Sequence, residues 1–248
     1  MIQRLGIIGA GHLAGFVAEG LRNAGWDGSL ILPERPSAAA FAERFGAEIA
    51  ATSQSVIDVA DAVLVAVRPA QVDEALTDVT WPEDCLLISA MAGVKIDRLA
   101  ALAHGARIVR AMPISAAIIN ASPTPVFPRD EVVEALFALI GAVIPMEDEA
   151  MLEVASANAA AYGWHFRLID GLVKANVKAG LSNEAAKRIG VETLIAAARV
   201  ALVGDRGGEE ILKTLATPGG ITAQGLALLD EADAFAPWDA AFAAVAER

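Results

Sequence analysis

A short hydrophobic segment that runs directly into a glycine turn constrains this chain more than any other feature. Residues 5–8 (L-G-I-I) are followed by G-A-G-H-L-A at 9–14 and then by an apolar helical pattern. In this G-x-G-x-x-A arrangement the first glycine permits the tight turn and the second lets a pyrophosphate approach the backbone. The free N–H groups at the start of the helix would hold the phosphates. The motif therefore predicts a dinucleotide-binding domain at the start of the chain.

The pattern of the first 147 residues predicts a Rossmann-type α/β domain, a doubly wound parallel sheet, because short aliphatic segments alternate with helical ones. We expect strands at residues 5–8, 30–32, 62–67, 85–89, 107–111, 124–127 and 142–145. We expect helices at residues 13–24, 38–45, 71–77, 96–103 and 130–140. Residues 148–248 show helical spacing almost throughout, with Ser182 as a helix cap and Pro237 in a first turn, and predict an all-α dimerisation domain.

Composition limits the class of protein. The chain of 248 residues is 55% hydrophobic, yet no apolar run reaches the roughly 18 residues that a membrane-spanning helix needs. The start of the chain does not resemble a signal peptide, so we expect a cytoplasmic protein that buries apolar surface between subunits, as a homodimer or higher homo-oligomer. A net charge of −12 argues against nucleic acid and membrane partners. The single cysteine, Cys85, and three scattered histidines predict neither a disulfide nor a metal site.

The end of the second expected strand bears on the choice of cofactor. Residues 32–35 read L-P-E-R, at the position where the ribose of a dinucleotide is bound. Glu34 would accept a hydrogen bond from a ribose 2′-hydroxyl, which suits NAD, whereas Arg35 would pair with a 2′-phosphate, which suits NADP. The two side chains would otherwise form a solvated surface pair. The sequence favours NADP and leaves NAD open.

A second glycine motif, T-P-G-G-I-T at 217–222, precedes a helix of the second domain. Pro-Gly-Gly exposes successive backbone N–H groups directly before the helix, and this makes a neutral nest that suits a carboxylate. The hydroxyl of Thr222 would add an adjustable donor. The alternative is a plain turn between helices.

Together these motifs resemble the pyrroline-5-carboxylate reductase family nearly end to end. The matching segments are G-A-G-H-L-A at 9–14, A-V-R-P at 66–69, S-A-M-A-G-V at 89–94, V-R-A-M-P at 109–113, V-K-A-G-L at 177–181 and T-P-G-G-I-T at 217–222. The resemblance implies an oxidoreductase that uses NAD(P)H to reduce the C=N bond of a cyclic imino acid. The substrate would be pyrroline-5-carboxylate, giving proline, or a close analogue, and the active site would lie at a dimer interface.

The same resemblance implies roles for individual residues. The cofactor-binding set comprises Gly9, Gly11, His12, Leu13 and Ala14 at the pyrophosphate, Glu34, Arg35, Ser53, Val67 and Arg68 along the nucleotide, and Ala90, Met91, Ala92 and Pro113 toward the nicotinamide. The substrate-binding set comprises Gly219, Gly220, Ile221, Thr214 and Asp148. Thr222 would position the ring nitrogen, and Asp205 or Asp148 would stabilise the protonated imine.

Two segments depart from the family pattern. M-P-N-T-P becomes M-P-I-S-A at 112–116, which removes an asparagine near cofactor or substrate. G-S-G-P-A becomes A-A-A-Y-G at 159–163, so Ala160 replaces a serine near the substrate. The replacement lies among aromatic residues, which usually belong to a core. The functional interpretation is a reshaped pocket in which Tyr162 or His165 donates the proton.

Two other functions remain open. A β-hydroxyacid dehydrogenase would carry G-x-x-x-K-x-x-N, but here Asn176 follows Lys174 one residue too early, and Lys174 then reads as a solvated helix residue. A cofactor-binding regulator without catalysis would also fit the altered segment at 159–163. Fold likeness alone does not separate these functions.

Overall fold

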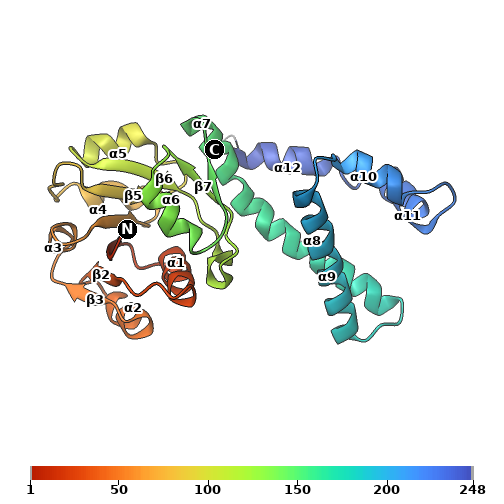
Figure 1. Cartoon of the computed structure of the whole chain (residues 1–248), viewed down its shortest axis with the longest axis horizontal. Helices are drawn as coiled ribbons and strands as arrows, with labels where there is room; N and C mark the ends of the chain where they lie inside the picture. Colours follow the sequence, from red (N-terminus) through yellow and green to blue (C-terminus); the bar gives the residue numbers. More distant parts are fainter. Residues whose placement is uncertain (1, 247–248) are drawn as a thin grey trace. The chain divides into compact units, whose positions relative to one another are not determined.

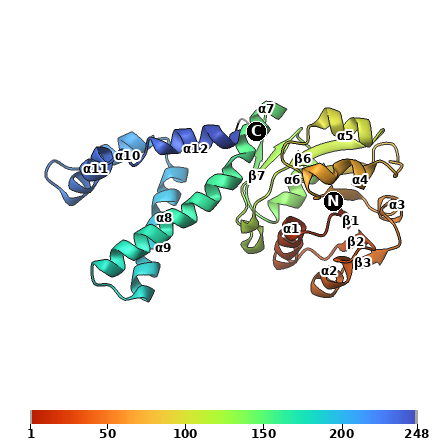
Figure 2. The same cartoon turned by 180° about the vertical axis from the view of Figure 1, so that it is seen from behind.

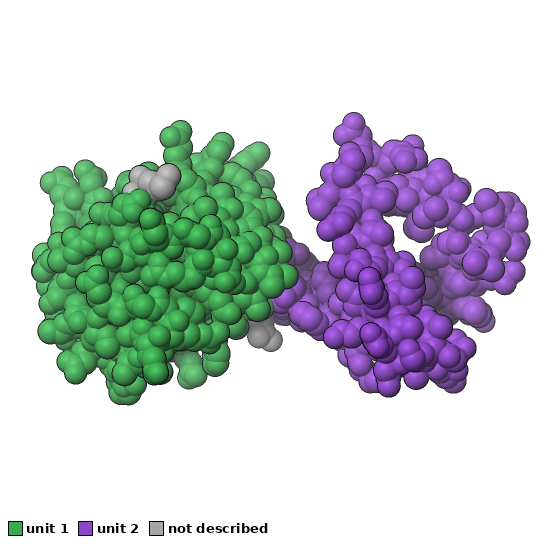
Figure 3. Space-filling view, turned by 60° about the horizontal axis from the view of Figure 1, so that its bottom comes forward, with its two compact units in different colours: residues 1–156 green, residues 157–248 purple. Residues whose placement is uncertain are grey.

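The computed structural model describes residues 2–246 and contains two compact units, Met1–Ser156 and Ala157–Arg248 (Figure 3). Residue 1 and residues 247–248, which belong to the two predicted domains, lie outside the described residues. Helix α7 (Glu149–Ser156) is grouped with unit 1, and the domain boundary between residues 147 and 148 stays a prediction.

An eight-stranded, mostly parallel sheet forms the centre of unit 1, in the order β3-β2-β1-β4-β5-β6-β7-β8. The strands are β1 (Arg4–Ile8), β2 (Ser29–Pro33), β3 (Glu48–Ala50), β4 (Ala62–Val65), β5 (Leu86–Ser89), β6 (Arg107–Ala111), β7 (Thr124–Phe127) and β8 (Val143–Pro145). The doubly wound fold is confirmed, with one difference. β7 runs antiparallel to β6, because the 3-10 helix η2 (Ser115–Ile119), rather than a crossover helix, joins them.

Helices cover both faces of this sheet, with α1 and α2 on one side and α4 and α5 on the other (Figure 1). They are α1 (His12–Asn23), α2 (Ala38–Phe45), α3 (Ser53–Ile57), α4 (Val72–Leu76), α5 (Ile96–Leu102), α6 (Glu131–Ala138) and the 3-10 helix η1 (Pro69–Gln71). One apolar cluster includes Leu21 of α1 and Phe137 of α6, and a second includes Leu76 of α4 and Leu99 of α5. The sheet is therefore buried on both faces, as a parallel sheet requires.

Helix α1 is fixed against a distant segment through Gly20. A Cβ atom at this position would lie 2.3 Å from the carbonyl oxygen of Ala117 in η2, so only glycine allows the close approach. Asn120 follows η2 in the left-handed region, at φ 55°, and its side-chain amide donates to the carbonyl oxygens of Gly20 (2.7 Å) and Leu139 (2.8 Å). Asn120 thus ties α1 to the end of α6.

Unit 2 consists of helices, as predicted, and Figure 2 shows them from behind. They are α8 (Asn158–Lys178), α9 (Asn183–Val203), α10 (Gly208–Leu215), α11 (Ile221–Glu231) and α12 (Pro237–Ala246). Ser182 caps α9, since its Oγ accepts from the N–H of Ala185 at 3.2 Å, and α12 begins at Pro237; both features agree with the sequence analysis.

Large apolar side chains are exposed on unit 2. The exposed fraction is 85% for Leu202, 88% for Val203 and 88% for Ile221. Isolated exposed apolar residues are common, but several on one small helical unit indicate a surface that another protein surface covers. Within residues 2–246, no helix is both long enough and apolar enough to span a membrane.

Candidate functional site

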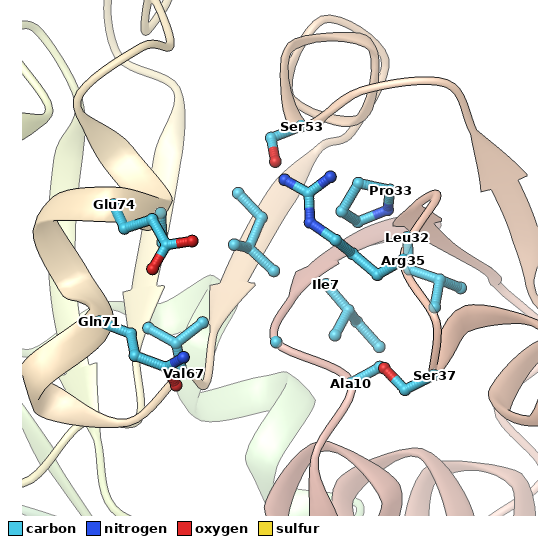
Figure 4. Close-up of a pocket in the computed structure, with 13 residues that line it drawn as sticks. Ile7, Ala10, Leu32, Pro33, Arg35, Ser37, Ser53, Val67, Gln71 and Glu74 are labelled. Carbon is cyan, nitrogen blue, oxygen red and sulfur yellow. The ribbon is translucent and has the colours of Figure 1, made fainter.

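A cavity of about 270 Å³ opens in unit 1 beside the glycine turn, at the carboxyl ends of β1, β2 and β4 (Figure 4). Ligands of doubly wound sheets bind at this edge. Apolar residues supply much of its surface, and polar side chains enter from two opposite walls. The lining residues are Ile7, Ile8, Gly9, Ala10, Leu32, Pro33, Arg35, Ser37, Ser53, Val67, Gln71, Glu74 and Ala75.

The glycine turn leaves room for an anionic group at the start of α1. Gly9 has φ +105°, and a Cβ there would lie 2.7 Å from the backbone of Ala66 and Val67, so the turn requires glycine. Gly11 is the N-cap of α1 and makes no side-chain capping bond, and a Cβ at Gly11 would meet nothing within 4 Å. The helix therefore begins with uncapped N–H groups beside open space, an arrangement that fits a pyrophosphate. His12, Leu13 and Ala14 form this first turn.

Three potential donors gather on the β2 side of the cavity: Arg35, Ser37 and Ser53 (Figure 4). Ser37 is the N-cap residue of α2, but its side chain makes no capping bond. Glu34 is exposed and does not line the cavity, and its carbonyl oxygen accepts from Nη1 of Arg35 at 3.1 Å. The arginine rather than the glutamate thus faces the cavity.

Two polar residues on the opposite wall, Gln71 and Glu74, have no counterpart in the sequence analysis. Both come from the segment after β4, where η1 leads into α4. No motif marks them, because their place in the cavity follows from how α4 packs on the sheet. Val67 lines the same wall, whereas Arg68 is exposed at the start of η1 and does not line the cavity.

The residues predicted for the nicotinamide side lie outside this cavity, beyond the ends of β5 and β6. Ala90, Met91 and Pro113 are buried, and Ala92 is exposed. The carbonyl oxygen of Met91 lies 3.4 Å from Nη2 of Arg110. Arg110 lies on β6, the strand next to β5 in the sheet. Arg110 therefore contacts the loop assigned to the nicotinamide.

Arg110 is a buried cation whose importance the sequence analysis missed. Its side chain is 0% exposed, and its Nη1 lies 2.7 Å from Glu149 and 2.5 Å from Glu153, both on α7. The same oxygen of Glu149 accepts from the N–H of Ile96 at 2.8 Å, at the start of α5. One guanidinium thus connects β6, α7 and the loop after β5.

The turn at 217–222 forms a helix start in unit 2. Gly219 has φ +77°, and Gly220 is the N-cap of α11 without a side-chain capping bond. The N–H of Gly220 is already used, since it donates to the carbonyl oxygen of Thr217 at 2.9 Å. Ile221 and Thr222 begin the helix and are exposed. Their N–H groups are the ones that an anion would reach.

The other predicted substrate residues belong to different elements of the fold. Thr214 donates from its hydroxyl to the carbonyl oxygen of Ile211 at 2.6 Å within α10. Asp148 belongs to unit 1 and accepts from the N–H of Met151 at 2.7 Å, at the start of α7. Asp205 is exposed between α9 and α10. Their predicted roles at the substrate stay predictions.

The aromatic residues of the altered segment pack within unit 2. The His165 ring stacks on Trp238 of α12 with ring centroids 5.8 Å apart, and Trp164 meets the same indole edge-on at 6.0 Å. Tyr162 contacts Phe166 edge-on at 5.1 Å. These contacts agree with a packing role, and the proposed proton donation by Tyr162 or His165 stays a prediction.

Lys174, the residue on which a β-hydroxyacid dehydrogenase would depend, is engaged on the surface of α8. Its Nζ lies 2.7 Å from Asp170, and its side chain is 70% exposed. The hydrogen bond from Lys174 is the main cause that lowers the pKa of Asp170. This is an ordinary i,i+4 surface pair.

Comparison with known proteins finds a separate family model for each part of the chain. A family model described as "NADP oxidoreductase coenzyme F420-dependent" matches residues 4–93, and one described as "Pyrroline-5-carboxylate reductase dimerisation" matches residues 148–248. The pyrroline-5-carboxylate reductase of Escherichia coli is 27% identical over 93% of this chain and 91% of its own length.

Solved structures show the same fold. The 1-pyrroline-5-carboxylate reductase of Streptococcus pyogenes matches with a TM-score of 0.88 at 24% identity, over 98% of this chain and 96% of that chain. The pyrroline carboxylate reductase of Plasmodium falciparum, solved with NADP bound, matches with a TM-score of 0.85 at 21% identity, over 98% and 95%. The relatives match both units across nearly the whole chain, so the chain is similar to pyrroline-5-carboxylate reductases from end to end.

Proposed function

We propose that this protein is an NADPH-dependent reductase of the C=N bond of a cyclic imino acid, with pyrroline-5-carboxylate or a close analogue as substrate and proline or its analogue as product. The observation that carries the proposal is that one chain contains two helices that begin after a glycine and leave their first N–H groups without a side-chain cap. One lies beside the cavity of unit 1 and the other follows Gly220 in unit 2. The names of the relatives that span both units support the same reaction.

The cavity fits the adenosine half of a dinucleotide phosphate. The first turn of α1 would hold the pyrophosphate, and Arg35 with Ser37 and Ser53 would hold a 2′-phosphate. Glu34, the residue that would favour NAD, does not line the cavity, and this supports NADP over NAD. When bound, the reduced nicotinamide supplies a hydride.

The substrate end of the proposal rests on α11. The N–H groups of Ile221 and Thr222 would bind the substrate carboxylate, and the hydroxyl of Thr222 would orient the ring nitrogen. A protonated imine accepts hydride more readily than a neutral one, so a carboxylate such as Asp205 or Asp148 would stabilise the cation. Tyr162 or His165 would supply the proton.

We also propose a homodimer formed through unit 2. The support is the exposure of large apolar side chains such as Leu202, Val203 and Ile221, together with the dimerisation model that matches residues 148–248. The cytoplasmic location stays a prediction.

The test is the oxidation of NADPH by the purified protein on addition of pyrroline-5-carboxylate, followed through the absorbance of the reduced nicotinamide. A panel of five- and six-membered cyclic imines, each with and without a carboxylate, would identify the substrate. Activity confined to carboxylate-bearing imines is the expected result. Oxidation of a hydroxy acid that Lys174→Ala abolishes would favour a dehydrogenase instead. Tight NADPH binding without turnover on the panel would favour a regulator.

A further inference from the structure

The wall of the cavity opposite Arg35 carries an acidic side chain that the phosphate-binding machinery does not explain. Glu74 of α4 lines the cavity, and its carboxylate points toward the open space that Arg35 enters from the other side (Figure 4). Gln71 lies on the same wall. A carboxylate is an acceptor only and repels phosphate, so a ligand group that lies against Glu74 would be a hydrogen-bond donor.

Glu74 differs from Asp73, the acidic residue that precedes it on α4, in its contacts. The carboxylate of Asp73 pairs with Arg98 at 2.7 Å. Asp73 does not line the cavity. The Glu74 carboxylate forms no ion pair or hydrogen bond with the part of the chain that the structure describes, so it is free to accept from a ligand.

The adenosine half of a dinucleotide presents two chemically different ends. Its phosphate groups are anionic and suit the wall of Arg35, Ser37 and Ser53. Adenine presents apolar ring faces and an exocyclic amine, N6, which donates. Ile7, Leu32 and Val67 also line the cavity and would supply an apolar surface for the ring.

We propose that Glu74 accepts a hydrogen bond from the exocyclic N6 amine of the cofactor's adenine, and that it thereby selects adenine over a base with oxygen at that position. This inference rests on the proposed function only in that the cavity binds a dinucleotide. The charge of Arg35 on one wall and of Glu74 on the other fixes which way the adenosine half enters. Glu74 is thus a specificity-determining residue.

The test compares reduced NADP with its hypoxanthine analogue, in which a carbonyl oxygen replaces the N6 amine. Binding of each nucleotide is titrated through the fluorescence of the reduced nicotinamide, without imine substrate. Both nucleotides carry the same phosphates, so the ratio of their dissociation constants cancels the general effect of a changed surface charge. We expect the native protein to bind the hypoxanthine analogue roughly tenfold more weakly, because a carboxylate cannot donate to the oxygen.

Glu74→Gln is expected to reduce this ratio to less than about threefold, since an amide both accepts from N6 and donates to the oxygen. Asp73→Asn is the matched control, because it removes the same charge from the adjacent residue and should keep the native ratio. Thermal unfolding of both variants checks that they fold. Equal binding of the two nucleotides by the native protein, or an unchanged ratio in Glu74→Gln, would overturn the inference.

The outcomes also separate this inference from the proposed function. Failure of both nucleotides to bind would overturn the inference together with the cofactor assignment. A tenfold ratio that Glu74→Gln removes, combined with no turnover of any cyclic imine, would support the role of Glu74 and overturn only the reductase assignment.

Discussion

Arg110 and Glu149 form an ion pair in which the guanidinium is completely buried, with Nη1 and Oε1 2.7 Å apart. Glu153 accepts from the same nitrogen, and both carboxylates lie on α7, the last helix of unit 1. The pair therefore holds α7 against the sheet, and through the carbonyl oxygen of Met91 it also reaches the loop assigned to the nicotinamide.

Loss of this cation should destabilise unit 1. Arg110→Ala leaves two neighbouring carboxylates without their partner, and we expect the free energy of unfolding to fall by about 3 kcal/mol. Urea denaturation followed by circular dichroism measures the change. Arg98→Ala removes an exposed arginine from its pair with Asp73 and should cost less than about 1 kcal/mol. Equal losses in the two variants would contradict a special role for Arg110.

We expect different effects from substitution of the two glycines in the turn, on cofactor binding at Gly11 and on stability at Gly9. Gly11→Ala should fold normally, because its Cβ meets nothing within 4 Å, but should weaken NADPH binding by roughly tenfold or more because the methyl group enters the phosphate space. Gly9→Ala should lose stability, since its Cβ would lie 2.7 Å from the backbone of Ala66 and Val67. Thermal unfolding and nucleotide titration separate the two effects.

Gly15→Ala is the control for the turn. It lies inside α1, where its Cβ would make ordinary contacts with Phe45 at 3.8 Å. Alanine is the better helix former by roughly 1 kcal/mol, so this variant should be slightly more stable and bind NADPH as the native protein does. Weaker binding in Gly15→Ala would point to a general effect on α1.

Arg35 should determine the preference for NADPH over NADH. Arg35→Ala is expected to weaken NADPH binding by roughly tenfold and to leave NADH binding almost unchanged, because only NADPH carries the 2′-phosphate. Competitive titration of the two nucleotides measures the preference. Arg44→Ala removes an equal charge from an exposed pair with Glu19 and should leave the preference intact. A parallel loss for both nucleotides would place Arg35 away from the 2′-phosphate.

Thr222 should affect turnover rather than cofactor binding. Thr222→Ala is expected to lower kcat on a cyclic imino acid by roughly tenfold or more while the dissociation constant of NADPH stays within about twofold. Steady-state kinetics and nucleotide titration give the two values. Thr193→Ala on α9, whose hydroxyl donates only to the carbonyl oxygen of Ile189, is the matched control. Equal losses of turnover and cofactor affinity would indicate a folding role for Thr222.

The only cysteine offers a probe of unit 1. Burial raises the pKa of the Cys85 thiol, so at a given alkaline pH less thiolate is present than in a free cysteine. The folded thiol holds its proton to higher pH than the unfolded one, and its contribution to stability is lost as the pH rises through the folded pKa. Reaction with an aromatic disulfide reagent should be slow in the native protein and fast in urea. Equal rates would contradict the burial.

The parallel strands could be predicted because each is a continuous apolar run between helical patterns, as in β4 and β5. The strand β3 could not, since its three residues are half-buried or exposed and include Glu48. The turns at Gly9 and Gly219 could also be predicted from the sequence, because glycine is the residue that suits their positive φ angles.

The missed residues of the candidate site depend on packing between distant segments. Arg110 interrupts an apolar strand, and its partners lie 39 and 43 residues further along the chain, so no local pattern reveals the ion pair. Glu74 is one of several acidic residues on the surface, and only the packing of α4 brings it to the cavity. The spacing of residues in the sequence therefore predicts neither the ion pairs of Arg110 nor the position of Glu74 in the cavity.

The close contact at Gly20 has a consequence for how the cofactor is held. The start of α1 faces the cavity, while its second half is held at Gly20 by η2 and by Asn120, which lies 100 positions further along the chain. The donors that meet the pyrophosphate are therefore positioned before any ligand arrives, and little conformational freedom remains to be lost on binding. We therefore expect substitutions at Gly20 or Asn120 to weaken nucleotide binding, although neither residue lines the cavity.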